Sequence, residues 1–326
     1  MDSDRSQLTR GYAIALAAAA VLSTTAIFIR HLTQTYGLPA LVLACWRDAF
    51  VCLTLVPVLA VVRPRLLRVE RRHLAFLAAY GLLLATFNAT WTLSVALNGA
   101  AVSTVLVYSS CAFTALLGRW LLGERLGWGK LLAVALSFAG CTLVSGALHA
   151  AGWHANLLGI ITGVLSGLWY AGYSLMGRAA AHRGLDPWTT VLATFAFATI
   201  FLLVANLTSA GHIPGAARRP QDLLWLGHAW SGWLVLLLLA AGPTVAGFGL
   251  YNMSLVHLPS SVANLIVSLE PVFTTGTAYV LFGERLDATQ LAGSLLILGA
   301  VVVLRAHEGR LERQATTRLQ QAGAET

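Results

Sequence analysis

Ten stretches of mostly apolar residues divide this chain, and each is long enough to cross a lipid bilayer as one helix. About 20 apolar residues in a helix span a hydrocarbon core about 30 Å thick. Backbone groups in lipid must find their hydrogen bonds within the protein, so we expect an all-α polytopic membrane protein with ten transmembrane helices. The stretches lie at residues 12–30, 39–62, 73–97, 100–121, 129–148, 156–177, 187–207, 232–256, 260–282 and 288–305.

The composition agrees with this interpretation. Hydrophobic residues make up 57% of the chain and charged residues only 10%, whereas soluble domains carry roughly a quarter charged residues. The net charge is +8, and the basic residues that produce it fall between the apolar stretches. We therefore interpret them as topology signals and expect no nucleic-acid partner. The cysteines lie inside predicted spans without metal-ligand spacing, so we expect no metal, cofactor or disulfide: Cys45, Cys52, Cys111 and Cys141.

The distribution of Arg and Lys sets the expected orientation. With the N-terminus inside, the inner segments hold sixteen of these residues and the outer segments four. Positive residues are enriched on the cytoplasmic side of membrane proteins. We therefore expect both termini, residues 1–11 and 306–326, to be cytoplasmic. The abundance of Arg, Ala and Gly indicates a GC-rich bacterial genome, and hence an inner (plasma) membrane.

The two halves of the chain share a pattern at an offset of 160 residues. The motif GERL at 123–126 returns at 283–286, and the register holds without a gap from about residue 89 to residue 144. Each half, 12–148 and 156–305, carries five spans, and an odd number places the second copy upside down in the membrane. The sequence thus predicts two inverted five-helix repeats, an organisation typical of secondary transporters.

One glutamate lies inside the ninth stretch and is followed at once by a proline. Glu270 is about 15 Å deep, close to the bilayer midplane. Pro271 removes a backbone donor, so we expect a locally opened helix with Pro271 as its kink or gating point. Glu270 then binds a cationic group, carries a proton or holds a gate. The alternative is a neutral glutamate that hydrogen-bonds a neighbouring helix, and the sequence leaves both open.

A second ionisable residue, Arg47, lies about 12 Å deep in the second stretch. It keeps its charge and therefore needs a partner or water. Its neighbour Asp48 points about 100° away around the helix, so we do not expect the two to meet. Arg47 then pairs with Glu270 across a central cavity or binds a substrate carboxylate. Alternatively, it extends to the outer interface or bonds loop carbonyls.

Aromatic and amide side chains gather in the same region of the predicted bundle. Their flat faces and hydrogen-bonding groups suit a cavity for a small amphipathic or cationic solute. Each residue alone is more typical of packing between helices, so the hypothesis depends on the cluster. Its members are Trp91, Tyr108, Trp169, Tyr170, Tyr173, Tyr251, Asn88, Asn252 and Asn264.

Small residues recur every four positions in the sixth stretch, at Gly159, Gly163, Gly167 and Ala171. This spacing makes a smooth face for close helix packing. We expect that face to be covered within the chain, with a homodimer contact as the alternative, so the protein is a monomer or a homodimer.

The charged residues of the two GERL motifs lie at helix ends rather than inside the spans. We expect Glu124 with Arg125, and Glu284 with Arg285, to anchor the helix ends and fix the following loops. They are not expected to bind substrate.

These features resemble the EamA family of the drug/metabolite transporter superfamily. The resemblance covers about residues 10–305 and rests on the ten spans, the two halves, the paired GERL motifs and the segment LEPVF in the ninth span. The block from Glu270 to Leu286 is its most specific part. Arg47, Trp169 and Tyr173 also look like family positions.

The fourth span departs from the family pattern, which often has a proline there. This chain has Cys111, after Ser110, which leaves open whether the fourth span is broken. The resemblance implies transport of small organic metabolites, often outward, but the fold alone names no substrate.

The sequence contains no phosphate-binding loop, zinc pattern or nucleophile motif, so we expect neither an enzyme nor an ATP-driven pump. It predicts a secondary transporter that moves a small organic metabolite or drug by alternating access, as an exporter and with protons as the candidate coupling ion. The alternative is an integral membrane enzyme or accessory subunit that acts on a lipid-linked substrate.

Overall fold

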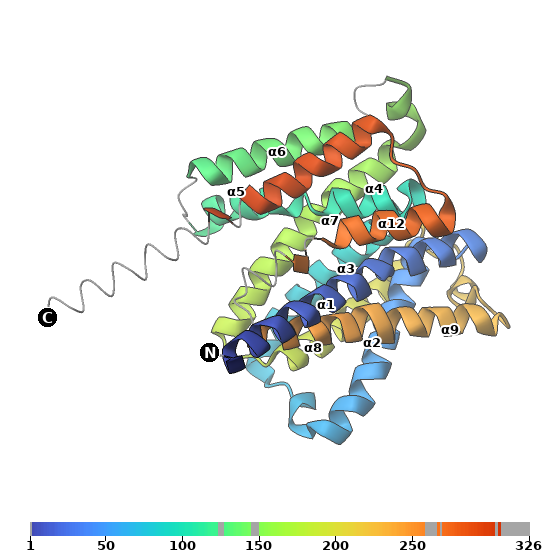
Figure 1. Cartoon of the computed structure of the whole chain (residues 1–326). Coiled ribbons are helices and arrows are strands. Elements are labelled where there is room, and N and C mark those ends of the chain that lie inside the picture. Colours follow the sequence, from blue (N-terminus) through green and yellow to red (C-terminus); the bar gives the residue numbers. More distant parts are fainter. Residues whose placement is uncertain are drawn as a thin grey trace, which may run out of the picture.

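The structure is a computed structural model that describes residues 2–122, 127–144, 150–257, 266–267, 269–303 and 306–307. Every regular element in these residues is a helix (Figure 1). Six of the described helices are long and apolar enough to cross a membrane. They are Arg10–Thr35, Ala40–Val62, Arg71–Asn98, Leu157–Gly177, Pro187–Thr208 and Trp230–Tyr251. The chain is therefore an all-helical polytopic membrane protein.

The elements follow one another along the chain with short connections. The first half holds α1 (Asp2–Thr35), α2 (Ala40–Val62), η1 (Pro64–Leu67), η2 (Arg71–His73), α3 (Leu74–Asn98), α4 (Ala100–Val107), α5 (Ser110–Leu122) and α6 (Trp128–Val144). The second half holds α7 (Ala150–His182), α8 (Pro187–Thr208), η3 (Pro220–Leu224), α9 (Trp230–Leu239), the π-helical η4 (Ala240–Ala246), α10 (Gly247–His257) and α12 (Glu270–Phe282). A last apolar helix covers Ala288–Val303.

Six of the predicted spans coincide with the six long helices, which confirms them. Two others correspond to shorter helices, α6 and the helix Ala288–Val303. The predicted span 100–121 is divided into α4 and α5, and much of the first half of the predicted span 260–282 lies outside the described residues.

Local sequence determines where several helices begin and end. Gly99 joins α3 to α4 with φ of 86°, a conformation that residues with a side chain rarely adopt. Asp186 caps α8 by accepting the N–H of Trp188 at 2.8 Å, and Pro187 occupies the first turn, where no N–H is needed. Gly283, with φ of 66°, ends α12.

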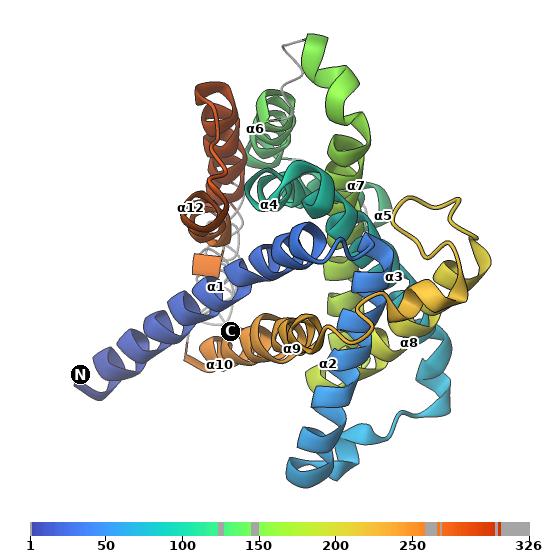
Figure 2. The ribbon, with the colours of Figure 1, turned by 90° about the vertical axis from the view of Figure 1, so that its right-hand side faces the viewer.

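Helix α1 lies between α12 on one side and α9 with α10 on the other (Figures 1 and 2). One turn beyond the start of α12, the buried Thr274 hydroxyl donates to the Ser23 carbonyl of α1 at 3.0 Å. The start of α12 is thereby fixed against the first helix of the chain.

The small-residue face of α7 packs against α3, α4 and α5 within the same chain. The Ser94 hydroxyl of α3 donates to the Gly159 carbonyl at 3.1 Å. A Cβ at Gly163 would lie 2.8 Å from the same hydroxyl, and one at Gly167 would meet Ser109. The small-residue face of α7 is therefore used for helix packing within the chain.

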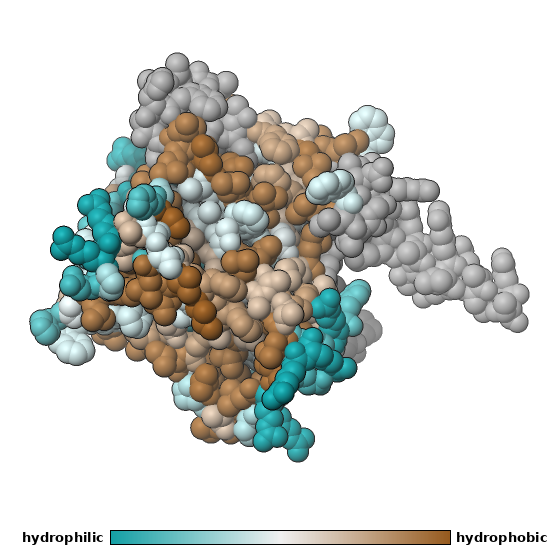
Figure 3. Space-filling view, turned by 180° about the vertical axis from the view of Figure 1, so that it is seen from behind, coloured by the Kyte–Doolittle hydropathy of each residue, from teal (hydrophilic) through white to brown (hydrophobic). Residues whose placement is uncertain are grey.

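Large apolar side chains cover much of the outer surface, as in a protein whose solvent is lipid (Figure 3). Examples are Leu53 and Ile200, which are exposed in the interior of α2 and α8, and Val280, which is exposed near the end of α12. In water such a surface would drive association, and in a bilayer it faces acyl chains.

Candidate functional site

In the described part of the ninth predicted span, a helix begins at the Glu-Pro pair, and the predicted opening at Pro271 stays a prediction. Helix α12 begins at Glu270, with Pro271 in its first turn and Leu269 in a turn before it. A proline is well tolerated there because the first N–H groups of a helix have no partner within the helix. Glu270 therefore occupies the N-terminal end of α12, where the helix dipole favours a negative group.

The fourth span is also broken, although it contains no proline. Helix α4 ends at Val107 and α5 begins at Ser110. Between them, the N–H groups of Tyr108 and Ser109 turn back to the carbonyls of Val105 and Leu106 at 3.1 and 3.0 Å. The sequence left open whether the fourth span is broken, and the structure shows a turn at Tyr108 and Ser109 that interrupts it.

The two helix breaks are joined by a hydrogen bond. The Tyr108 hydroxyl lies 3.1 Å from Glu270 Oε2 and 3.2 Å from the Val267 carbonyl oxygen. A phenol carries a single hydrogen, so Tyr108 donates to one of these two acceptors at a time. The hydroxyl of Tyr108 is therefore shared between the Glu270 carboxylate and the backbone just before it.

A second polar cluster links α2 to α3. Arg47 Nε lies 3.3 Å from Asp48 Oδ1, and the Asn88 amide donates to Asp48 Oδ1 and Oδ2 at 2.9 and 2.8 Å. Arg47, Asp48 and Asn88 are all buried. The Arg47 guanidinium also lies 5.9 Å from the centre of the Trp91 ring.

This cluster corrects the expectation that Arg47 and Asp48 do not meet. Their Cβ atoms diverge around the helix, but the long arginine side chain turns back and brings its Nε to the shorter carboxylate. The ion partner of Arg47 is therefore Asp48, and the described hydrogen-bond partner of Glu270 is Tyr108. Sequence reasoning missed Asp48 as a site residue, although an acid eight or nine residues into an apolar span was a sufficient signal.

Aromatic rings extend from the Arg47 cluster along α3 and α7. Trp91 stacks on Phe87 at 6.1 Å between ring centres, and Phe87 lies 5.4 Å from Tyr170. Tyr170 stacks on Tyr173 at 6.4 Å, and Tyr173 lies 4.8 Å from Tyr80. The structure thus brings Trp91, Tyr170 and Tyr173 into one row, together with Phe87 and Tyr80, which the sequence did not single out.

The remaining predicted residues lie apart or outside the description. Trp169 is on α7 beside Tyr170, and Tyr251 is on α10, which packs against α1. Asn264 and the side chain of Asn252 lie outside the described residues. A central cavity around Glu270 therefore stays a prediction.

Three buried donors near these clusters have no hydrogen-bond partner in the described part of the chain. They are the indole N–H groups of Trp91 and Trp169 and the hydroxyl of Ser109, at the break between α4 and α5. Buried donors are seldom left unpaired. In the described residues these three donors are therefore unsatisfied.

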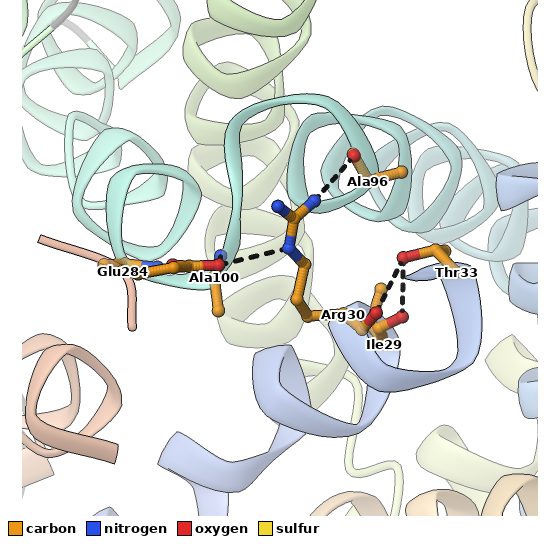
Figure 4. A network of polar contacts seen from close by, with 7 residues as sticks. Ile29, Arg30, Thr33, Ala96, Ala100 and Glu284 are labelled. Atoms are coloured by element: carbon orange, nitrogen blue, oxygen red, sulfur yellow. Dashed lines mark hydrogen bonds and ion pairs between the residues drawn. The ribbon is translucent and has the colours of Figure 1, made fainter. Parts of the chain in front are cut away.

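A charged network lies near the C-terminal end of α1 (Figure 4). Glu284 accepts the N–H groups of Ala100 and Ala101 at 3.2 and 3.1 Å, and so caps α4. Arg30 Nε lies 3.1 Å from Glu284 Oε1, and its Nη1 donates to the Ala96 carbonyl at 2.9 Å. As expected of a helix-end anchor, Glu284 fixes the loop that follows α12, and it also completes a helix of the first half.

Interrupted helices are tolerated inside a membrane where they line a path for a solute. Together, the bundle and the ionisable groups at its interruptions define a membrane transporter. The chain belongs to the EamA-like transporter family, whose family model matches residues 9–146 and again residues 157–306. The family consists of transporters, which agrees with the expectation that this chain is not an enzyme.

Two curated relatives carry the name "Probable amino-acid metabolite efflux pump". The protein of Escherichia coli K12 is 23% identical over 272 residues, which cover 82% of this chain and 86% of the relative. The protein of Salmonella typhimurium LT2 is 25% identical over 206 residues, which cover 63% and 67%. A solved crystal structure with a TM-score of 0.58 and 17% identity covers 91% of this chain and 97% of its own, and it supports the fold alone.

Proposed function

We propose that this protein is a secondary exporter that carries a small organic metabolite out across the plasma membrane by alternating access. The observation that carries this proposal is the bond between Tyr108 and Glu270. It ties the interruption of one helix to the start of another, so a ligand at Glu270 acts on both halves of the chain at once.

The helix boundaries support two inverted five-helix repeats with ten spans in total. Helix α5 runs from Ser110 to Leu122 and α12 from Glu270 to Phe282, so both ends are displaced by 160 residues. The two separate matches of the family model agree with this division. With the Arg and Lys distribution, we place both termini in the cytoplasm and the Arg30–Glu284 network at the outer surface.

The cargo class that fits the clusters best is an amphipathic metabolite of the amino-acid type, as the names of the two relatives suggest for those proteins. Glu270 would hold its ammonium group. The unpaired donors of Trp91, Trp169 and Ser109 would serve its carboxylate. The aromatic row of α3 and α7 would contact its apolar part.

Proton coupling follows from competition for one carboxylate. Glu270 holds either a proton or the cationic group of the cargo, and not both. Facing outward, it would release the cargo and take a proton; facing inward, it would release the proton and take the cargo. If the carrier changes its facing with either the proton or the cargo bound, but not with Glu270 empty, each proton that enters is exchanged for one cargo molecule, and an inward proton gradient would drive export.

Tyr108 would transmit this exchange to the helices. When a cargo ammonium occupies the carboxylate, the phenol turns its single hydrogen to the Val267 carbonyl, its other neighbour at 3.2 Å. The link between the two breaks is then weakened, and the half-helices become free to move apart.

The test compares metabolites outside cells that express the intact protein, Glu270→Gln or Glu312→Gln at matched membrane levels. The control makes the same change in the polar C-terminal tail, which the sequence places outside the spans. We expect a compound to accumulate outside with the intact protein and the control, and to fall to background with Glu270→Gln. Tyr108→Phe, which removes the donor and keeps the ring, should give an intermediate rate.

If the intact protein and Glu270→Gln exported the compound equally, the protein would still be an exporter, but the role of Glu270 would be purely structural. The absence of any exported compound, in cells fed the twenty amino acids and their common derivatives, would contradict the proposed export.

A further inference from the structure

A positively charged pocket lies on the opposite side of the bundle from Glu284. Its volume is about 210 Å³, and its walls come from the α2–α3 loop and the α7–α8 loop. The basic residues that line it are Arg65, Arg68, Arg72 and Arg183, with His73 beside them.

The two acidic residues of the pocket are already engaged. Glu70 Oε2 lies 2.6 Å from Arg72 Nε, and Asp186 caps α8 through the N–H of Trp188. Arg65 and Arg68 have no carboxylate within ion-pair distance in the described part of the chain. The pocket therefore presents positive charge that the protein does not neutralise.

Arg183 is held in place by an aromatic ring. Its guanidinium lies 3.8 Å from the centre of the Phe76 ring on α3. Stacking of this kind uses the flat face of the guanidinium and leaves the N–H groups at its edge available. Those N–H groups are the ones that match the oxygens of a phosphate.

Exposed apolar residues flank the charged loop of the pocket in the sequence. Val61 and Val62, the last residues of α2, are 85% and 67% exposed, and Leu74, the first residue of α3, is also exposed. They stand within a few residues of the arginines in the chain. A free inorganic anion would contact only the arginines, whereas a phospholipid would contact the arginines with its phosphate and the apolar residues with its acyl chains.

We propose that this pocket binds the phosphate headgroup of an anionic phospholipid of the cytoplasmic leaflet. The choice of leaflet rests on the orientation given under the proposed function. The arginines bind the phosphate, and the acyl chains lie along the exposed ends of α2 and α3.

The bound headgroup joins the two halves of the transporter. The α2–α3 loop belongs to the first segment matched by the family model and Arg183 to the second. The two already touch where the Thr189 hydroxyl donates to the Leu66 carbonyl at 2.8 Å. A lipid held by both loops stabilises this arrangement of the halves against others.

The test is native mass spectrometry of the full-length protein, delipidated in detergent and titrated with phosphatidylglycerol or phosphatidylcholine. The double variant Arg65→Gln/Arg68→Gln removes two lining arginines. Its matched control, Arg63→Gln/Arg71→Gln, removes two exposed arginines of the same loop that do not line the pocket. The two variants have the same net charge.

We expect phosphatidylglycerol affinity to fall about tenfold further in the lining variant than in the control. Direct hydrogen bonds to phosphate add to the diffuse attraction that both variants lose. Phosphatidylcholine should bind weakly to all three proteins, and millimolar inorganic phosphate should not displace phosphatidylglycerol.

Equal losses in the two variants would overturn the proposal, because they would reduce the effect to diffuse surface charge. Displacement by inorganic phosphate would overturn it in favour of a soluble anion. The measurement involves no transport, and Glu270→Gln should bind phosphatidylglycerol normally. A failure of lipid binding is therefore distinguishable from a failure of the proposed export.

Discussion

At the scale of single residues, Asp48 connects two helices through one carboxylate. The group has no exposed surface, and Arg47 and Asn88 contact it. A buried pair of opposite charges contributes little net stability, because both ions lose their hydration. Removal of one partner is different, since the other charge is left buried without compensation.

We therefore expect Asp48→Leu to destabilise the protein by about 3–5 kcal/mol, because it leaves Arg47 uncompensated. The double variant Arg47→Leu/Asp48→Leu should recover much of this loss. The measurement is thermal unfolding of the purified proteins in detergent, analysed as a double-mutant cycle. A double variant less stable than either single variant would contradict this account.

The sequence indicated some of these residues but not their pairing. Glu270 and Arg47 stand out because ionisable groups are rare at bilayer depth. The partnership of Arg47 with Asp48 depends on the path of a long side chain, which residue spacing does not give. Likewise, the contact of Tyr108 with Glu270 joins residues 162 positions apart, and no local pattern predicts it.

At the scale of elements, the break between α4 and α5 is stabilised by packing rather than by proline. Gly167 of α7 lies directly against it, and a Cβ there would meet Ser109 Oγ, the Ser110 nitrogen and the Val107 carbonyl. The absence of a side chain lets α7 cover the turn. The same four-residue spacing that predicted a packing face did not reveal which turn it would pack against.

Gly167→Ala should thus destabilise the protein by about 1–3 kcal/mol by forcing α7 away from the break. The matched control is Gly276→Ala on α12, where a Cβ would meet nothing within 4 Å. That change should be neutral or stabilising by up to about 1 kcal/mol, as expected for alanine in a helix. Equal changes in melting temperature for the two variants would exclude the packing explanation.

At the scale of the whole molecule, the Arg30–Glu284 network joins α1, α3 and α4 to the loop after α12. Membrane character and the six long helices followed from hydrophobic stretches alone, because a bilayer leaves few alternatives. The contacts between the two halves could not be predicted from the sequence, because they depend on tertiary packing.

If this network closes the outer side, Glu284→Gln should favour an outward-open state by removing the charge that pairs with Arg30. A cysteine placed at Ala101, which is 2% exposed, should then react several-fold faster with a membrane-impermeant thiol reagent on native-cysteine-free protein. Arg285→Gln in the same loop is the control and should leave the rate unchanged. Slower labelling in Glu284→Gln would contradict an outer gate.

The cap of α4 also has a consequence for biosynthesis. The N–H of Ala100 finds its acceptor 184 residues further along the chain. While the ribosome is still translating the second half, the first half sits in the membrane with this helix end unfinished. We therefore expect membrane insertion of the first half to precede its final folding, and a chain that ends before Glu284 to leave the start of α4 without its cap.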